Sequence, residues 1–442
     1  MNFGRMGAGV GRMGRFGGMR PAARLLAGEA SGAAFDFVNM DMMIRGGGLD
    51  WSGDPNLKLT YTSPSTKWVR NASGVYVSGT TLRTDYLANG TALGLLIEGQ
   101  RTNVLLRSQD FSHSDWSKTD TTVTADATTS PDGTANADLL TEGTAGTALT
   151  AQTGTATTAS VAVAGAIFLK ASANITWAKV TLTDGSGTTG VDAWVNLSTG
   201  AIGTVTAKGT ATGAAATSEQ AANGFWRVKL TATFQSGVSN ARMIVQSASA
   251  DNSNTRVNNA AYYAWQAQAG IGPYSSSPIV TTSATVTRAA DDIKILLSQL
   301  PFDLTKGTLL AKVVPGSIAS GSKVIAILRE DANNYIQLYI STAARGAFGF
   351  VGGVTQFSFG AGQGSAVVGA PYKSALSFKA NDFAFSAGGI AAGTDTSGSL
   401  PTPTVLNLGS YNGASSHLEG WLQQLIYLPR DMSDAELVSW ST

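Results

Sequence analysis

Residues 225–234 read FWRVKLTATF, and this stretch decides the fold class. Every second side chain along it is apolar, and most of the side chains between them are arginine, lysine or threonine. A period of two places such sets on opposite faces of an extended chain, so the stretch predicts a half-buried β-strand. The apolar set is Trp226, Val228, Leu230, Ala232 and Phe234.

Comparable runs lie on both sides of this strand, separated by clusters of Gly, Asn, Asp and Ser rather than by segments of helical period. Many strands without intervening helices indicate an antiparallel sandwich of the jelly-roll kind, which we place at residues 108–288. The runs lie at residues 161–169, 175–183, 191–197, 241–247 and 260–267.

A second group of strand-like runs predicts another β-sandwich over residues 289–442. Residues 330–334, EDANN, lie between two of these runs and indicate a hairpin turn. Ser433 and Glu436 have the spacing of a capping box, which predicts a short helix that closes the sandwich. The runs lie at residues 307–315, 323–330, 335–341, 375–380, 383–387 and 421–429.

Residues 1–49 differ from the rest of the chain, because they repeat Gly-Arg-Met-Gly and Gly-Arg-Phe-Gly. We expect an extended arm whose Met and Phe side chains dock in apolar grooves of a partner. A disordered tail is an alternative interpretation, and an RNA-binding Gly/Arg segment is a weaker one. The residues expected to anchor the arm are Phe3, Arg5, Met6, Arg12, Met13, Arg15 and Phe16.

Residues 50–107 hold too little apolar material for a core of their own, so we expect a small β-rich connecting region that leans on its neighbours. The predicted fold class is therefore all-β: two antiparallel β-sandwich domains preceded by an extended arm rich in Gly, Arg and Met. The composition agrees, because charged residues make up only 13% of the 442 residues and glycines number 52.

Charge and cysteine content exclude several functions. The formal net charge of +1 gives no global attraction to nucleic acid or to an anionic membrane, so we predict neither as a partner. The absence of cysteine rules out disulfides, thiolate metal sites and a cysteine nucleophile. The longest nearly unbroken apolar run, residues 161–169, is far shorter than the roughly 20 residues of a membrane span, and we predict no signal peptide.

The sequence offers little catalytic chemistry. Neither histidine sits in a recognisable triad, and no phosphate loop or zinc motif occurs, so we predict no catalytic residue, no cofactor and no metal. Carboxylate pairs for glycoside hydrolysis are the alternative: Asp184 with Asp192, or Glu330 with Asp331. Both pairs lie at Gly- or Asn-rich turns, where capping of backbone groups is the simpler role.

Tryptophans give a softer signal, since aromatic rings stack on the apolar faces of sugars. Trp177, Trp194 and Trp265 lie on predicted strands of the middle module, and we take them as candidates for glycan stacking. The alternative is that these rings fill the core, as large aromatic residues on alternating strands usually do.

The stretch at residues 94–116, GLLIEGQRTNVLLRSQDFSHSDW, resembles a segment common in structural proteins of tailed bacteriophages. The shared pattern is Gly-Leu-Leu-Ile-Glu, two residues, Arg-Thr-Asn, an apolar pair, then Ser-x-Asp-Phe and a Trp. The resemblance continues through stretches that together cover most of residues 60–293. The ending at residues 418–437 is similar to the close of concanavalin A-like or laminin-G-like sandwiches, and the middle module to a carbohydrate-binding-module jelly roll.

The resemblance implies a virion component: a homotrimeric fibre, spike or decoration protein of tail or head, without a signal peptide and assembled in the host cytoplasm. Its arm would bind other virion proteins, such as portal, tail, capsid or adaptor, and its lectin-like sandwiches would face host-surface polysaccharide. The alternative function is a polysaccharide-degrading glycoside hydrolase of the tailspike type. No catalytic residue of a family can be carried over, so we expect no enzyme.

Polar residues of the same stretch suggest a joint between modules. Glu98, Arg101 and Asn103 lie among apolar residues at the border of the connecting region and the jelly roll. We expect Glu98 to form an ion pair with Arg101 or to hydrogen-bond exposed backbone there. Such a pair stabilises most when it is partly buried.

Overall fold

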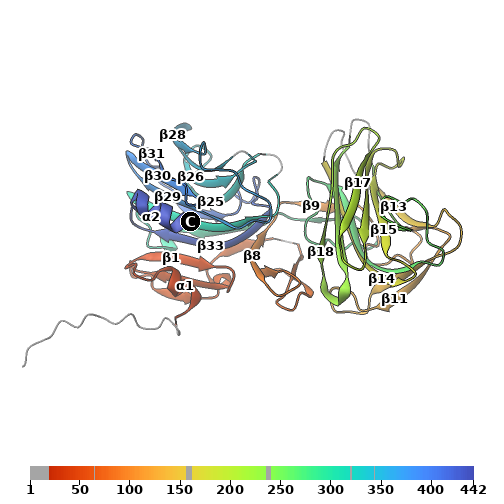
Figure 1. Ribbon diagram of the computed structural model, residues 1–442. Helices are drawn as coiled ribbons and strands as arrows, with labels where there is room; N and C mark the ends of the chain where they lie inside the picture. Colours follow the sequence, from red (N-terminus) through yellow and green to blue (C-terminus); the bar gives the residue numbers. More distant parts are fainter. Residues whose placement is uncertain (1–18, 64, 156–161, 235–239, 319–320, 343) are drawn as a thin grey trace, which may run out of the picture.

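The computed structural model describes residues 19–63, 65–155, 162–234, 240–318, 321–342 and 344–442. These residues form two β-sandwich bodies side by side (Figure 1). All sheet pairings are antiparallel, and helices are short, which confirms the predicted all-β class.

The jelly roll consists of two six-stranded sheets that face each other across an apolar core. One sheet has, in order, β10 (Ser117–Thr119), β13 (Leu149–Thr155), β20 (Asn240–Ala248), β15 (Trp177–Thr183), β16 (Gly190–Asn196) and β17 (Ile202–Lys208). The other has β11 (Thr121–Thr128), β12 (Ala137–Glu142), β21 (Ala261–Ile271), β14 (Ala162–Ala173), β19 (Trp226–Thr233) and β18 (Thr212–Gln220).

The strand β19 comes from FWRVKLTATF, and its alternation is confirmed except at Trp226, which is only partly buried, and at Arg227. Val228, Leu230 and Ala232 are buried in the jelly-roll core, as predicted. Arg227, on the face expected to be polar and open, is also buried. Its guanidinium lies 5.5 Å from the ring centre of Phe168 and donates to the carbonyl of Ser276. Neighbouring segments therefore cover this end of the outer face of β19.

The second sandwich pairs a ten-stranded sheet with a seven-stranded one. The larger sheet runs β3 (Trp51–Gly53), β2 (Asp41–Arg45), β1 (Gly32–Asp36), β33 (Gly420–Leu428), β24 (Lys306–Pro315), β29 (Tyr372–Lys379), β30 (Asp382–Ala387) and β31 (Gly393–Asp395), with β8 (Ala92–Ile97) also on β33 and β7 (Thr84–Tyr86) on β8. The smaller runs β28 (Val354–Phe359), β27 (Arg345–Val351), β26 (Tyr335–Ile340), β25 (Lys323–Arg329), β32 (Val405–Leu408), β23 (Asp292–Leu296) and β4 (Thr60–Thr62).

Two short helices cover the outer face of the ten-stranded sheet (Figure 1). The first, α1 (Pro21–Leu25), and the last, α2 (Asp434–Ser441), bury apolar residues against it. The predicted capping box of α2 is confirmed, because the side chains of Ser433 and Glu436 each accept from the other's backbone. Three 3₁₀ turns complete the elements: η1 (Pro55–Leu57), η2 (Ala222–Gly224) and η3 (Leu297–Gln299).

The jelly roll is inserted into the second sandwich, which differs from the sequential domain order expected from the sequence. The chain builds β1 to β4, β7 and β8 of the second sandwich, enters the jelly roll through β9 (Arg101–Asn103), and returns through β22 (Val286–Arg288). These two strands pair with each other, so the entry and the exit lie side by side. The expected boundary at residue 49 is corrected accordingly: β1 pairs with β33, which places residues 32–53 in the sheet instead of an arm.

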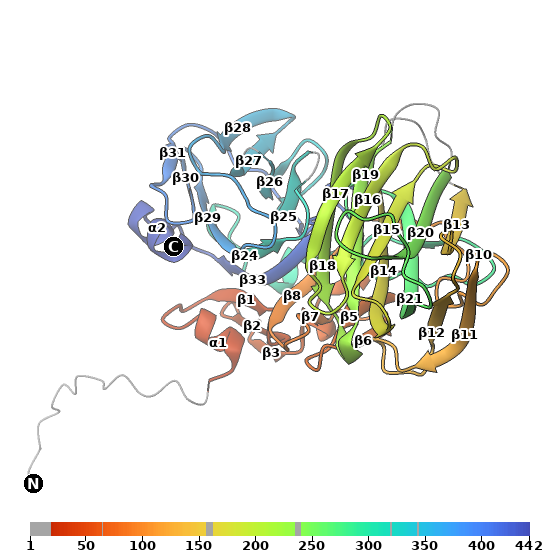
Figure 2. The same cartoon turned by 45° about the vertical axis from the view of Figure 1, so that its right-hand side comes forward.

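The connecting region leans on its neighbours, and its strands β5 (Lys67–Arg70) and β6 (Tyr76–Gly79) form a separate hairpin. This hairpin packs on the outer face of the jelly roll (Figure 2). Tyr76 lies edge-on to Phe168 with ring centres 5.3 Å apart, and Trp265 lies 5.0 Å from Phe168. The hairpin therefore helps to bury Arg227, because Tyr76 and Arg227 both contact Phe168.

Candidate functional site

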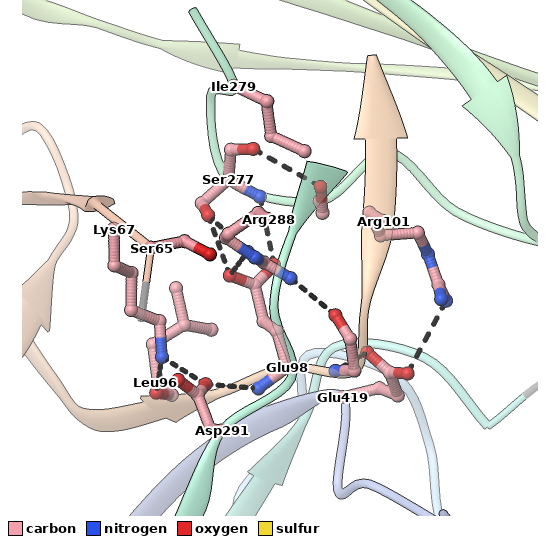
Figure 3. A network of polar contacts seen from close by, with 12 residues as sticks. Ser65, Lys67, Leu96, Glu98, Arg101, Ser277, Ile279, Arg288, Asp291 and Glu419 are labelled. Atoms are coloured by element: carbon pink, nitrogen blue, oxygen red, sulfur yellow. Dashed lines mark hydrogen bonds and ion pairs between the residues drawn. The ribbon is translucent and has the colours of Figure 1, made fainter. Parts of the chain in front are cut away.

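A buried network of charged residues lies where the chain passes between the two sandwiches (Figure 3). Glu98, directly after β8, forms an ion pair with Arg288 of β22, and both side chains are almost fully buried. Glu98 also accepts from the backbone N–H of Ser277 at 2.9 Å and from its hydroxyl at 2.7 Å. Arg288 donates to the carbonyl of Gly99 at 2.6 Å, so one ion pair connects three segments.

Lys67 and Asp291 form a second buried pair beside the first. Asp291 accepts from the backbone N–H of Glu98 at 2.8 Å and from the hydroxyl of Tyr61 at 2.9 Å. Burial alone would raise the pKa of Glu98, but the charges of Arg288 and Lys67 and the bonds from Ser277 outweigh it and lower that pKa to about 2.

Arg101 pairs with Glu419 instead of with Glu98, which corrects the pairing expected from the sequence. Its guanidinium lies 3.4 Å from the carboxylate of Glu419 and stacks 4.7 Å from the ring centre of Tyr274. Gly99 donates its N–H to Glu419 at 3.3 Å, and a Cβ at Gly99 would lie only 2.9 Å from that carboxylate. Both actual partners, Arg288 and Glu419, are distant in sequence, so no local pattern reveals them.

Asn103 holds the point where the chain enters the jelly roll. Its amide donates to the carbonyls of Ala267 and Ile279, and its oxygen accepts from the N–H groups of Leu105 and Ala269, at 2.9 to 3.1 Å. Four hydrogen bonds saturate a buried amide, so Asn103 fixes the entry strand to β21 and to the loop that follows it.

Glu419 makes the joint sensitive to pH. Burial and the charge of Glu98 raise its pKa to about 7 against the opposing effect of Arg101. A raised carboxyl pKa means that the folded protein holds the proton more tightly than the unfolded chain, so stability falls as pH rises from about 4.5 through about 7. Glu98 acts in the opposite sense, because its lowered pKa adds stability above about pH 4.5 that is lost as pH falls toward 2.

We therefore expect replacement of Glu419 by glutamine to flatten the stability profile on the alkaline side. The native protein should lose up to about 3 kcal/mol between pH 4.5 and pH 8 through this group, and Glu419→Gln should lose less. Urea denaturation at both pH values measures the difference. Equal losses in the two proteins would contradict the raised pKa of Glu419. The control is Asp382→Asn, which removes an exposed carboxylate elsewhere in the chain and should leave the profile unchanged.

A cavity of about 690 Å³ lies above this network, between the two bodies. One wall is the hairpin, with Trp68 and Arg70, and another is the outer face of β18 and β19, with Lys229. Tyr274 and Trp421 line it from the loop after β21 and from the start of β33. The cavity is thus assembled from both sandwiches and the hairpin, and Glu98 and Glu419 lie in its lining.

Glu219 of β18 is the centre of the polar wall of the cavity. It lies 2.9 Å from the ammonium of Lys229, 3.4 Å from Arg227 and 3.8 Å from Arg70. Burial opposes ionisation, but the three cations outweigh it and hold the pKa of Glu219 well below its usual range. Three cations therefore share the carboxylate of Glu219. Of the three, Arg70 also forms an ion pair with a second carboxylate, that of Asp85.

Two of the three tryptophans predicted to stack on sugars are buried, whereas stacking needs an exposed ring face. Trp265 is fully buried under the hairpin, and Trp194 is 2% exposed, with Lys179 over its ring and its indole N–H on the carbonyl of Ser253. A buried ring offers no face to a sugar, so these two are corrected to core residues. Trp177 is partly buried on β15. The sequence search missed Trp68 and Trp421, because neither belongs to the middle module.

The anchoring residues proposed for the arm, Phe3 to Phe16, lie outside the described residues. The carboxylates considered for hydrolysis have structural partners. Asp184 accepts from Ser186 and Thr188 in its own turn, and Asp192 lies 2.9 Å from the ammonium of Lys179.

Glu330 and Asp331, the other pair considered, bond to neighbouring backbone and side chains at the surface. Within the described ranges, no group of three or more His, Cys, Asp or Glu side chains is arranged to hold a metal ion. No helix in the described part of the chain is long and apolar enough to cross a membrane.

No protein-family model matches the chain, and no curated protein matches it. Among solved structures, the Ruminococcus gnavus IT-sialidase CBM40 bound to alpha2,3 sialyllactose is 16% identical, with a TM-score of 0.27 over 31% of this chain and 84% of that chain. Domain 4 of AbnA, a GH43 extracellular arabinanase from Geobacillus stearothermophilus in complex with arabinotriose, is 11% identical, with a TM-score of 0.27 over 36% and 78%. Mouse laminin alpha1 chain domains LG4-5 are 9% identical, with a TM-score of 0.22 over 78% and 93%. The all-β assignment rests on the strand pairing rather than on these matches.

Proposed function

We propose that the protein is a structural component of a tailed-bacteriophage virion, a fibre, spike or decoration protein of tail or head that contacts host-surface glycans. The observation that carries the proposal concerns residues 94–116. The stretch that resembles phage structural proteins supplies β8, β9 and Glu98, and these residues join the two sandwiches through paired strands and buried ion pairs. Two sandwiches held in this way suit a protein that presents binding surfaces outward from a particle.

Adhesion is favoured over polysaccharide degradation by the roles of the candidate carboxylates. Asp184 and Asp331 accept hydrogen bonds within their own turns, Asp192 pairs with Lys179, and Glu330 accepts from Thr402. These structural roles favour adhesion over acid and base catalysis by these carboxylates. We also infer that the copies assemble as homotrimers on the virion. Release of reducing sugar from host glycans by the purified protein would favour the degrading alternative instead.

We expect deletion of residues 2–18 to abolish incorporation into virions while leaving the fold intact. The deletion removes the proposed anchor residues but spares β1 and β2, whereas a deletion through residue 49 would also remove two strands of the large sheet. Purified particles from a complemented phage should carry less of the shortened protein by on the order of tenfold or more, measured by mass spectrometry. An unchanged thermal midpoint shows that the variant is folded, and equal incorporation would refute the anchor.

A further inference from the structure

We propose that the cavity between the two sandwiches binds a carboxylated sugar. The proposal deepens the adhesion role and rests on that role only for the biological source of the glycan.

Positive charges outnumber negative charges on the polar wall. Among the cavity's cations, Arg70, Arg227 and Lys229 share Glu219, and Asp85 is the further carboxylate on this wall, so one positive charge is in excess. The carboxylates of the floor have their own cations, since Glu98 pairs with Arg288 and Glu419 with Arg101.

Three side-chain donors of the lining residues make no hydrogen bond within the described part of the chain. They are Nη1 of Arg70, Nε of Arg227 and the hydroxyl of Tyr274, all of them buried atoms of residues that line the cavity. Lys229 has one hydrogen bond, to Glu219, although an ammonium carries three donors. Buried donors without partners cost free energy, and a ligand rich in acceptors offsets that cost.

Aromatic and aliphatic side chains supply the other half of the site. Trp68, Trp421 and Tyr274 are only partly buried, and they line the cavity from three different segments. Ile318 and the half-exposed Val368 add apolar surface to its lining. A sugar ring has an apolar face and a polar edge, so it matches a cavity that offers both aromatic rings and hydrogen-bond donors.

The size and the charge of the site narrow the ligand class. The volume of about 690 Å³ falls within the usual range of about 300–1,000 Å³ for small-ligand pockets. An excess of one positive charge matches a carboxylate better than a phosphate monoester, which carries about two negative charges. A neutral sugar would leave the excess charge unpaired. The geometry therefore favours an acidic glycan, whether its carboxylate comes from a uronic acid or from a sialic acid.

Binding of three oligosaccharide probes to the purified full-length protein tests the proposal. The probes are trigalacturonate, 3′-sialyllactose and, as the neutral control, maltotriose, titrated by calorimetry and by tryptophan fluorescence. We expect at least one acidic probe to bind, with weaker binding at high salt, and maltotriose to bind on the order of tenfold or more weakly. The two acidic probes distinguish the source of the carboxylate.

Matched variants locate the site. Lys229→Gln should weaken binding of the acidic probe by about tenfold or more, since one charge-assisted hydrogen bond is lost. Lys208→Gln is the control, because Lys208 is similarly exposed and also pairs with a carboxylate, Asp192, but lies outside the cavity.

Tyr274→Phe tests the hydroxyl without removing the ring, and it should weaken binding by several-fold on the basis of one hydrogen bond. Tyr372→Phe is its control: Tyr372 also has a buried hydroxyl without a partner in the described ranges and an arginine over its ring, but it does not line the cavity. Unchanged thermal midpoints exclude a folding defect.

No binding of any probe, equal binding of maltotriose, or equal losses in the control variants would overturn the proposal. Incorporation into virions is measured separately through residues 2–18, so failure of the glycan site leaves the structural role standing, and failure of incorporation leaves the binding result standing.

Discussion

Replacing Arg288 with methionine is expected to lower the free energy of unfolding by about 3–5 kcal/mol. The change leaves Glu98 charged and 2% exposed, with Ser277 as its remaining direct donor in the network. It also leaves the carbonyl of Gly99 without the guanidinium that now bonds to it. Urea denaturation followed by tryptophan fluorescence measures the loss.

The double variant Glu98→Gln with Arg288→Met is the control for this expectation. Removing both charges of a buried pair is far less costly than removing one, because no buried charge then remains uncompensated. We expect the double variant to regain a large part of the lost stability. Lys294→Met, at a partly exposed ion pair with Asp292, should change stability by no more than about 1 kcal/mol. A loss for Arg288→Met as small as that for Lys294→Met would show that the joint network contributes little.

Replacing Trp265 with alanine is expected to cost about 3–5 kcal/mol and to loosen the hairpin of β5 and β6. The indole is fully buried between Phe168 and the hairpin residues Trp68 and Tyr76, so its removal leaves a large cavity beneath the hairpin. Because Trp68 and Arg70 of that hairpin line the interdomain cavity, glycan binding should fall with it.

The variant Trp265→Phe keeps an aromatic ring but fills less volume than tryptophan. A smaller ring keeps part of the contact with Phe168, so the loss of stability should be clearly smaller than with alanine. Limited proteolysis of residues 71–75, the turn of the hairpin, reports its attachment to the jelly roll. Unchanged protection of this turn in Trp265→Ala would contradict the role of Trp265 as its support.

The sequence predicts strands well where burial alternates or is continuous. β19, β24 and β33 carry many apolar residues and were found within one or two residues of their ends. β17 and β18 were missed, because their sheet-edge position leaves most of their Thr, Ala and Ser side chains at least partly exposed, so no apolar pattern forms. The residues of β1 were assigned to an arm, since a pairing between Ala33 and Tyr427 leaves no local signal.

The candidate site was predictable only in part, for the same reason. The polar residues of 94–116 drew attention to Glu98 and Arg101, but their partners come from β22 and from the residue before β33. The cavity collects Trp68, Lys229 and Trp421 from three separate segments, so its chemistry exists only after the two bodies dock. A local hint was present in Arg227 and Lys229, two cations alternating on β19 a few residues after Glu219.

The pairing of β1 with β33 also orders events during synthesis of the chain. Phe35 emerges from the ribosome well before its strand partner Leu425, which lies almost 400 residues further along the chain. All strands of the jelly roll lie between β1 and β33 in the sequence. The jelly roll can therefore complete its core before β1 has its partner strand. A chain that stops short of residue 420 therefore leaves β1 without its partner strand, so β1 can join the large sheet only after β33 has been made.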